Sequence, residues 1–130
     1  MDTRLILTDG PPGTGCATIS SVSGADAVLV VIEPSLTSLH DAARVIELVK
    51  GFNIPAFALI NKSDINPEIS DQIESFLQDN AVPLLGMIPF DPDIVKALIN
   101  GRSFVEFAPD SEASRIIRSV WSRLEEILEL

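Results

Sequence analysis

The residues best suited to chemistry form the segment Asp9-Gly10-Pro11-Pro12-Gly13-Thr14-Gly15-Cys16, directly after the apolar run Leu5-Ile6-Leu7. A phosphate-binding loop of the form G-x-x-x-x-G-K-[ST] would carry a lysine and a hydroxyl where this chain has Cys16 and Ala17. An aspartate at the end of a strand can instead hold Mg²⁺ through its water shell, while glycine amides face a γ-phosphate. The alternative is a plain turn that needs Gly and Pro for its backbone angles.

On the nucleotide interpretation, this segment is one half of a site whose lysine-bearing half lies outside the chain. We expect Asp9 to serve Mg²⁺ through water, and we expect the nucleotide contacts to include Gly10, Pro11, Pro12 and Gly13. Three glycines and two prolines within six residues exceed what a simple turn requires, which favours this interpretation.

Asn61-Lys62-Ser63-Asp64 is the second candidate, and it follows the apolar run Ala56 to Ile60. Parallel sheets place their ligands at the carboxyl ends of their strands. N-K-x-D is the pattern with which many GTPases bind guanine, where the aspartate accepts hydrogen bonds from the base. A turn into a helix that begins at Pro67 explains the same residues without a ligand.

Pro89-Phe90-Asp91-Pro92 is the third candidate, again directly after an apolar run. The segment could offer backbone groups and an apolar surface to a base. Asp91 could equally cap a helix that Pro92 opens, and the two interpretations are compatible.

Two single residues carry less weight. Cys16 is the only cysteine, whereas an iron–sulfur cluster takes four ligands, and small buried cysteines are commoner than reactive ones. His40, beside Asp41 near the start of a predicted helix, is more typical of a surface or packing residue than of a catalyst. We expect no catalytic residue in the isolated chain.

The elements that must position these residues follow from hydrophobic periodicity. Short apolar runs alternate with segments of helical period, which is typical of a parallel sheet with helices on both faces. The sequence therefore predicts a doubly wound α/β domain over residues 1–130. The predicted strands are Leu5 to Leu7, Ala27 to Ile32, Ala56 to Ile60 and Leu84 to Ile88; the predicted helices start at Ser35, Pro67, Asp91 and Ser111.

Two of these elements, the strand Ala27 to Ile32 and the last helix, allow more specific predictions. Ala27 to Ile32 shows no polar alternation, which predicts a central strand buried on both faces. The last helix has an apolar stripe that includes Trp121, and its glutamates would be repelled by an anionic membrane, so we expect Trp121 in the core.

Composition excludes several classes of function. With a formal charge of −10, the chain repels a phosphate backbone, and its nine Lys and Arg residues form no run, so nucleic acid is not an expected partner. No apolar run reaches the length of a membrane span, and the first residues lack the pattern of a signal peptide. We expect a cytoplasmic protein without a membrane segment.

Taken in order, the segments Asp9 to Cys16, Glu33-Pro34-Ser35 to His40-Asp41, Asn61 to Asp64 and Ile88 to Asp91 make the chain resemble the MinD/ParA/Mrp group of P-loop ATPases. It most resembles MinD-superfamily ATPases that carry an inserted ferredoxin domain. The resemblance implies that Asp9 helps hold Mg²⁺, that Gly10 and Gly13 belong to a γ-phosphate sensor, and that Asn61 and Pro89 lie by the adenine. It also implies dimers with ATP at the shared face, and work in iron–sulfur or metallocofactor assembly or redox chemistry.

The chain departs from this family in two respects. It lacks the K-G-G-x-G-K-[ST] loop and the cysteine-rich ferredoxin motifs, so it resembles only the C-terminal half of such a protein. We therefore expect ATP and Mg²⁺ in the complete protein, no hydrolysis by the chain alone, and an iron–sulfur cluster only together with the missing regions. Cys16 takes the place of a cluster ligand in the nitrogenase iron protein, which needs a second cysteine per chain.

Two alternatives remain open: a GTPase fragment, indicated by N-K-x-D, and an assembly module that pairs with a separate P-loop subunit and never binds nucleotide. The family's missing strand also has a consequence for the sheet, because it lies between Leu5 to Leu7 and Ala27 to Ile32. We expect Leu5 to Leu7 to pair with Ala27 to Ile32, to detach, or to accept a strand from another chain. The expected partner is a second copy or a P-loop-bearing chain.

Overall fold

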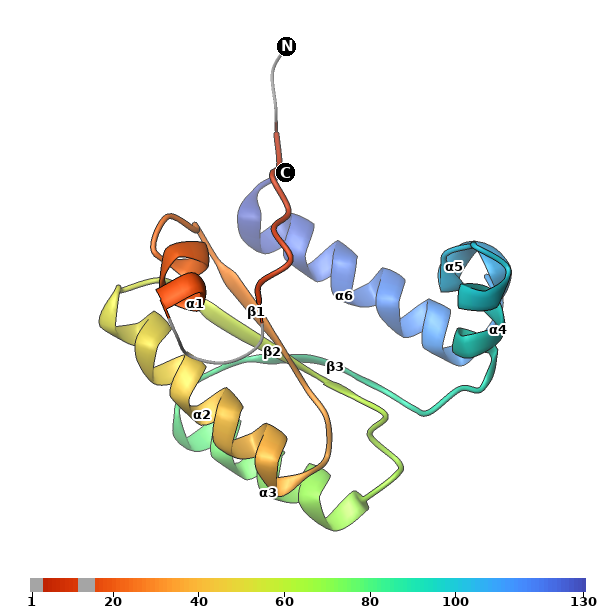
Figure 1. Ribbon diagram of the computed structural model, residues 1–130, viewed down its shortest axis with the longest axis horizontal. Coiled ribbons are helices and arrows are strands. Elements are labelled where there is room, and N and C mark those ends of the chain that lie inside the picture. The colour runs from red at the N-terminus through yellow and green to blue at the C-terminus, as the bar shows by residue number, and fades with distance from the viewer. Residues whose placement is uncertain (1–3, 12–15) are drawn as a thin grey trace.

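The computed structural model describes residues 4–11 and 16–130, with residues 16 and 17 described by their backbone alone. Helices cover a parallel sheet on both faces, as Figure 1 shows. The elements in chain order are α1 (Cys16–Val22), β1 (Val28–Ile32), α2 (Leu36–Gly51), β2 (Ala56–Asn61), α3 (Pro67–Asp79), β3 (Leu84–Ile88), α4 (Asp93–Ile99), α5 (Phe104–Phe107) and α6 (Glu112–Leu128).

The sheet has the order β1-β2-β3, and every pairing is parallel. Val28 pairs with Ala56 at one end of the β1–β2 ladder, and Asn61 pairs with Ile88 at the other end of the β2–β3 ladder. Because the strands are parallel, the loops that follow β1, β2 and β3 emerge from the same edge of the sheet. The second and third sequence candidates, Asn61 to Asp64 after β2 and Pro89 to Pro92 after β3, therefore share this edge.

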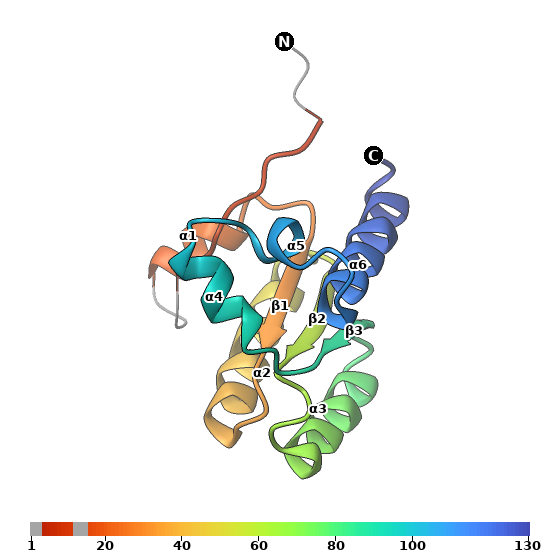
Figure 2. The same cartoon turned by 90° about the vertical axis from the view of Figure 1, so that its right-hand side faces the viewer.

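Alternation along β2 explains why both faces are covered. Ala58 and Ile60 belong to a core cluster with residues of α2 and α3, whereas Phe57 and Leu59 pack in clusters with residues of α6. Successive side chains of a strand point to opposite faces, so an all-apolar strand needs a helix layer on each side. Figures 1 and 2 show α2 and α3 on one side of the sheet and α6 on the other, which confirms the doubly wound α/β prediction.

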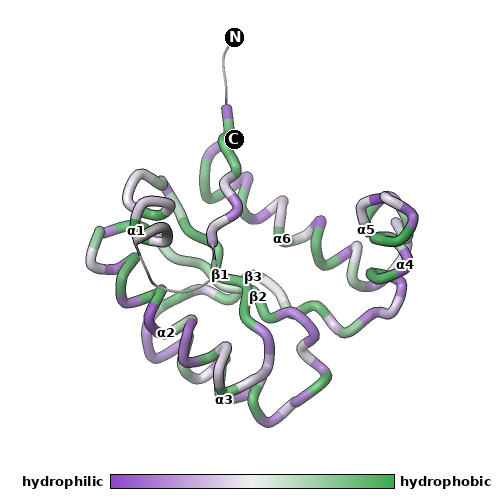
Figure 3. The backbone as a smooth tube through the Cα atoms, in the orientation of Figure 1, coloured by the Kyte–Doolittle hydropathy of each residue, from purple (hydrophilic) through white to green (hydrophobic). Residues whose placement is uncertain are grey.

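The helix starts follow the capping chemistry of the sequence. The hydroxyl of Ser35 accepts a hydrogen bond from the Ser38 amide at the start of α2, and the Asn66 side chain accepts from the Ile69 amide at the start of α3. Ser111 caps α6 in the same way. Each cap satisfies an amide that has no partner within its own helix. Figure 3 shows hydrophobic residues along the strands and a mixture of hydrophobic and hydrophilic residues along these helices.

One glycine sets the distance between α6 and the sheet. A Cβ added to Gly86 in β3 would lie 2.7 Å from Cγ2 of Val120 and 3.2 Å from Cγ2 of Ile116. The missing side chain therefore allows α6 to approach β3 closely. Arg123 of α6 strengthens this contact, because its Nη1 donates to the carbonyl of Leu85 at 2.9 Å.

The predicted first strand, Leu5 to Leu7, is wrong for this chain. Residues 4–11 have no regular secondary structure, and Ile6 and Leu7 are 82% and 86% exposed. A strand requires a partner for its backbone groups, and of the three outcomes considered for this run the structure has the second, a segment detached from β1. The prediction of a central β1 is wrong for the same reason: β1 lies at an edge, and Val31 is 58% exposed.

Two further differences concern helices. The core prediction for Trp121 is wrong, because this side chain is 42% exposed and lines a shallow cavity of about 220 Å³ with Arg4, Leu5, Glu125 and Leu130. The hydrophobic periodicity did not predict the short helices α1 and α5, which span seven and four residues. Helices this short carry too few turns for a periodic signal.

Candidate functional site

Asn61 and Lys62 stand where β2 ends, at the edge of the sheet that carries the loops. Lys62 has a left-handed backbone conformation (φ 53°), and its amide donates to the side-chain oxygen of Asn61 at 3.0 Å. Asn61 itself is half-buried. With its oxygen oriented in this way, the Asn61 amide group keeps its nitrogen as a donor and a second lone pair as an acceptor. The side chain can therefore offer both kinds of hydrogen bond to a flat polar ligand.

Lys62 also bridges two strand ends. Its Nζ lies 3.2 Å from Oε1 of Glu33, which follows β1, and the two side chains are 39% and 52% exposed. Sequence reasoning did not predict this ion pair. The parallel register could have indicated it, because Ile32 pairs with Ile60 and each charged residue follows its strand end by one or two positions.

The loops after β2 and β3 are joined by two hydrogen bonds. The Ser63 amide donates to the carbonyl of Ile88 at 2.9 Å. The Phe90 amide donates to Oδ1 of Asp64 at 2.7 Å. The N-K-S-D and I-P-F-D segments, 26 residues apart at the second bond, therefore lie side by side.

Pro89 and Phe90 present an apolar surface next to these polar groups. Pro89 is half-buried, and Phe90 is 51% exposed. Asp91 closes the loop by accepting from the Asp93 amide at 2.9 Å, close to the predicted capping role, although α4 begins at Asp93 and not at Pro92. The structure thus brings Asn61, Lys62, Asp64 and Pro89 together.

The glycine-rich segment is only partly described. Asp9, Gly10 and Pro11 are exposed and follow the detached run of residues 5–7. Pro12 and Gly13, together with Thr14 and Gly15, lie outside the described residues, and so does the side chain of Cys16, which begins α1.

The described part of the chain lacks a group of side chains that could bind a metal ion together. No group of three or more His, Cys, Asp or Glu side chains that could hold a metal ion occurs among the residues the structure describes. His40 is exposed on α2. In the same described ranges, none of the helices has the length and apolar character to cross a membrane.

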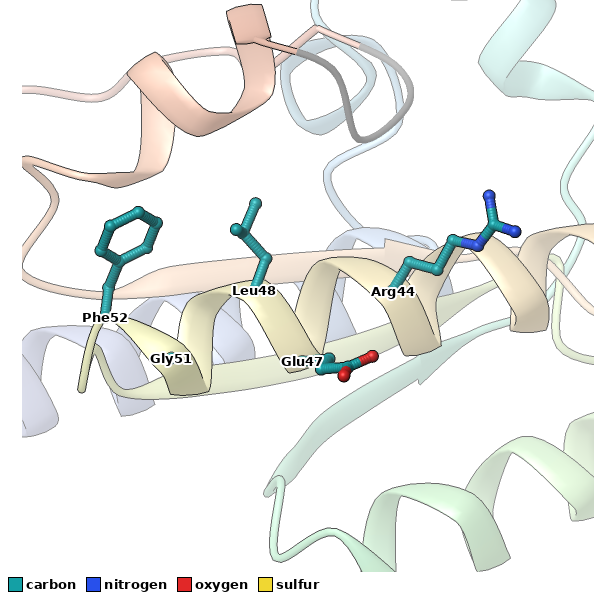
Figure 4. Close-up of a pocket in the computed structure, with 5 residues that line it drawn as sticks. All are labelled: Arg44, Glu47, Leu48, Gly51 and Phe52. Atoms are coloured by element: carbon teal, nitrogen blue, oxygen red, sulfur yellow. The ribbon is translucent and has the colours of Figure 1, made fainter.

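A larger hollow lies elsewhere. Its volume is about 610 Å³, and its lining comes from α2 and the residue after it: Arg44, Glu47, Leu48, Gly51 and Phe52. Figure 4 shows Arg44, Leu48 and Phe52 directed to the side where α1 lies, whereas Glu47 points away from them. Apart from Phe52, which follows the helix, these residues lie in the second half of α2, which returns from the loop edge towards the amino ends of the strands. This hollow is therefore distinct from the cluster around Asn61.

A doubly wound α/β domain with polar loops gathered at the carboxyl edge of a parallel sheet belongs to a class that binds ligands at that edge. Within this class, residues 1–125 match the family model described as ParA: NUBPL iron-transfer P-loop NTPase. The chain belongs to this family, and the resemblance to the MinD/ParA/Mrp group is confirmed.

Curated relatives support the same assignment. The chain is 32% identical over 124 residues to the uncharacterized ATP-binding protein MJ0547 of Methanocaldococcus jannaschii, which covers 93% of this chain and 46% of the relative. It is 31% identical over 125 residues to the uncharacterized protein MJ0578 of the same organism, covering 96% of this chain and 41% of the relative. The chain thus spans less than half the length of these relatives.

Solved structures agree on the fold. The septum site-determining protein MinD of Pyrococcus horikoshii, solved in complex with Mg-ADP, superimposes with a TM-score of 0.76 at 22% identity, covering 92% of this chain and 49% of that one. A ParA family ATPase of Chlorobium tepidum gives a TM-score of 0.65 at 28% identity, covering 82% of this chain and 46% of that one. At 22% identity, the likeness to MinD of Pyrococcus horikoshii shows the fold alone.

Proposed function

We propose that this chain is the C-terminal part of an ATP-binding P-loop NTPase of the MinD/Mrp type, in which it supplies the adenine side of the nucleotide site. The observation that carries this proposal is the junction of the N-K-S-D and I-P-F-D loops through Ser63–Ile88 and Asp64–Phe90 at the carboxyl edge of the sheet. ATP-binding in the name of one relative and Mg-ADP in one solved neighbour support it.

The junction has the chemistry that a purine requires. Asn61 offers a donor and an acceptor, and Pro89 with the half-exposed Phe90 offers apolar surface for the face of the ring. Lys62 is held towards Glu33, so its positive charge is partly neutralised within the site. In this proposal Asn61 and Pro89 contact the base, while Lys62 and Asp64 maintain the loops around it.

The phosphate side of the site is assigned to the glycine-rich segment. Asp9 would hold Mg²⁺ through water, which fits an exposed carboxylate, and Gly10 and Pro11 with Pro12 and Gly13 would face the γ-phosphate. Mg²⁺ bound there would neutralise phosphate charge. The lysine that such a site requires would come from a region outside this chain, and for that reason we expect no hydrolysis by residues 1–130 alone.

The open edge of β1 supports the proposal that a further strand belongs to the domain. Val28 to Ile32 is an all-apolar run, yet within the described part of the chain β1 has a neighbouring strand on one side only, and Val31 remains 58% exposed. Continuous apolar strands are typical of sheet interiors. Since the chain spans less than half of its curated relatives, the additional strand would come from the remaining part of the protein.

The family description also suggests the biological setting. It names iron transfer, and we propose that the complete protein serves iron–sulfur or other metallocofactor work. The full sequence has one cysteine, whereas an iron–sulfur cluster takes four ligands, so in this proposal a cluster would be bound together with further regions, with Cys16 as one ligand. We further propose a cytoplasmic protein that acts as a homodimer or with a P-loop-bearing partner chain.

Nucleotide titration tests this function. Isothermal titration of the complete protein with ATP and Mg²⁺ is expected to show saturable binding and slow hydrolysis, whereas residues 1–130 alone are expected to show no hydrolysis. The matched control is GTP under identical conditions. Preference for GTP would favour the GTPase alternative and remove the adenine assignment.

The second alternative, an assembly module, predicts a different pattern. Such a module would co-purify with a P-loop subunit, and neither ATP nor GTP would change the melting temperature of the chain's complex. Absence of binding to the complete protein at millimolar ATP would contradict the proposed function.

A further inference from the structure

Resting on the proposed function, we infer that Asp64 is a positioning residue that fixes the base-binding loop of β3, and that it does not read a guanine. The N-K-x-D motif is thereby used in this chain to shape an adenine-type site. The inference deepens the proposal because it assigns a role to the one residue of the motif that would otherwise favour GTP.

The geometry of Asp64 carries the inference. Its Oδ1 accepts from the Phe90 amide at 2.7 Å, which is short for a bond from an amide nitrogen and typical of a charged acceptor. The loop that it holds has few other backbone donors, because Pro89 and Pro92 carry no amide hydrogen. Asp64 therefore contributes directly to the position of Phe90.

The surrounding contacts explain why the carboxylate reaches this amide. The Ser63 amide donates to the carbonyl of Ile88, and the hydroxyl of Ser70 donates to the carbonyl of Ser63 at 2.7 Å, so Ser63 is held from both sides. Asp64 follows Ser63 directly, and Phe90 follows Ile88 by two residues. The backbone bond thus sets the register in which the side-chain bond forms.

The consequence concerns nucleotide specificity. In a guanine site, the aspartate of N-K-x-D must direct its oxygens at the ring and exocyclic nitrogens of the base. Here one of those oxygens is committed to a neighbouring loop, and the loop presents Pro89 beside Asn61. Loss of the Asp64 bond should therefore loosen the surface that contacts the base, without changing which base is preferred.

Two substitutions in the complete protein separate a positioning role from a guanine-binding role. Asp64→Ala removes the acceptor and should weaken ATP binding about tenfold, the order expected for a charged hydrogen bond. Asp64→Asn keeps an oxygen that can accept from Phe90, so ATP affinity should stay within about threefold of the original. Neither variant should gain affinity for xanthosine triphosphate.

The matched control is Asp79→Ala. Asp79 is an exposed aspartate at the far end of α3, away from the loop edge, and its substitution removes the same charge. It should leave ATP binding unchanged. Circular dichroism of all three variants verifies that the fold is intact before binding is compared.

A readout independent of nucleotide tests the bond itself. Hydrogen exchange is measured by mass spectrometry on the nucleotide-free complete protein, in a peptide that covers residues 88–93. This peptide has few amide hydrogens because it contains two prolines, so the Phe90 amide contributes a large share of its exchange. Asp64→Ala should speed exchange at Phe90 at least about fivefold, and Asp64→Asn should speed it less. This result stands even if no nucleotide binds, so failure of the proposed function and failure of the inference are distinguishable.

Either of two results would overturn the inference. One is unchanged exchange at Phe90 in Asp64→Ala. The other is a shift of preference from GTP to xanthosine triphosphate in Asp64→Asn, which would assign the carboxylate to a guanine.

Discussion

The close contact between Gly86 and α6 gives the sharpest prediction about stability. In Gly86→Ala, the new Cβ would lie 2.7 Å from Cγ2 of Val120, whereas ordinary contact begins at 3.4 Å. Helix α6 must therefore retreat by about 0.7 Å, or Val120 must leave its rotamer. Overpacking of this kind costs about 1–3 kcal/mol, and the loss of glycine's unfolded-state freedom returns about 0.4–1 kcal/mol. We expect a net loss of about 1–2 kcal/mol in the free energy of unfolding.

Urea denaturation followed by tryptophan fluorescence measures this loss, because Trp121 is the single tryptophan of the chain and lies on α6 beside Val120. The control is Gly51→Ala. A Cβ on Gly51 meets nothing within 4 Å, and this residue ends α2, so the variant should be about 0.5–1 kcal/mol more stable.

A double-mutant cycle separates steric overlap from other causes. Val120→Ala alone removes buried methyl groups and should destabilise, but the same change in the Gly86→Ala background should cost about 1 kcal/mol less, because it makes room for the new Cβ. Unaltered stability of Gly86→Ala, or strict additivity with Val120→Ala, would refute the described approach of α6 to β3.

Three further predictions concern other contacts. Ser114→Ala should lower the free energy of unfolding by about 1 kcal/mol, because the buried hydroxyl donates to the carbonyl of Ala108 at 2.7 Å; urea denaturation measures the change, and no loss would contradict the bond. The half-exposed pair Lys62 and Glu33 should show a coupling energy of less than about 1 kcal/mol in a double-mutant cycle, and a larger value would mean that the pair is shielded from water. Ile6→Lys should change the stability of residues 1–130 by less than about 0.5 kcal/mol, since Ile6 is 82% exposed, but should destabilise the complete protein if residues 5–7 pair there; equal effects in both would count against a completing strand.

Much of the fold could be predicted from the sequence, because its signals are local. The apolar run Ala56 to Ile60 predicted β2, and Asn66 with Pro67 correctly predicted the cap and the first residue of α3. Leu84 to Ile88 matches β3. In each case the predictive signal comes from residues that lie within the element or next to it in the chain.

The errors occurred where structure depends on a distant partner. Leu5 to Leu7 has the composition of a strand, but pairing requires a neighbouring strand, and no local signal says whether one is present. The central position predicted for β1 failed for the same reason. Trp121 lies on the apolar stripe of α6, yet it is 42% exposed because the facing surface is only a shallow cavity with Arg4 and Leu5.

The candidate site, like the fold, could be predicted from the sequence only in part. The sequence predicted that the N-K-S-D and I-P-F-D segments each follow a strand, and the structure places the two segments in contact. The partner of Asp64 could not be predicted, since the Phe90 amide is 26 residues away and its availability depends on the register of β2 and β3. The nucleotide roles of Asp9 and of the segment around Gly10 remain predictions.

Photo-crosslinking with 8-azido-ATP tests the central claim most directly, because it marks the protein surface that touches the adenine. In the complete protein with Mg²⁺, the labelled peptides should contain residues 61–64 and 88–91, and excess ATP should suppress labelling more strongly than excess GTP. Labelling confined to other segments, such as the hollow along α2, or equal suppression by GTP would contradict an adenine site at the carboxyl ends of β2 and β3.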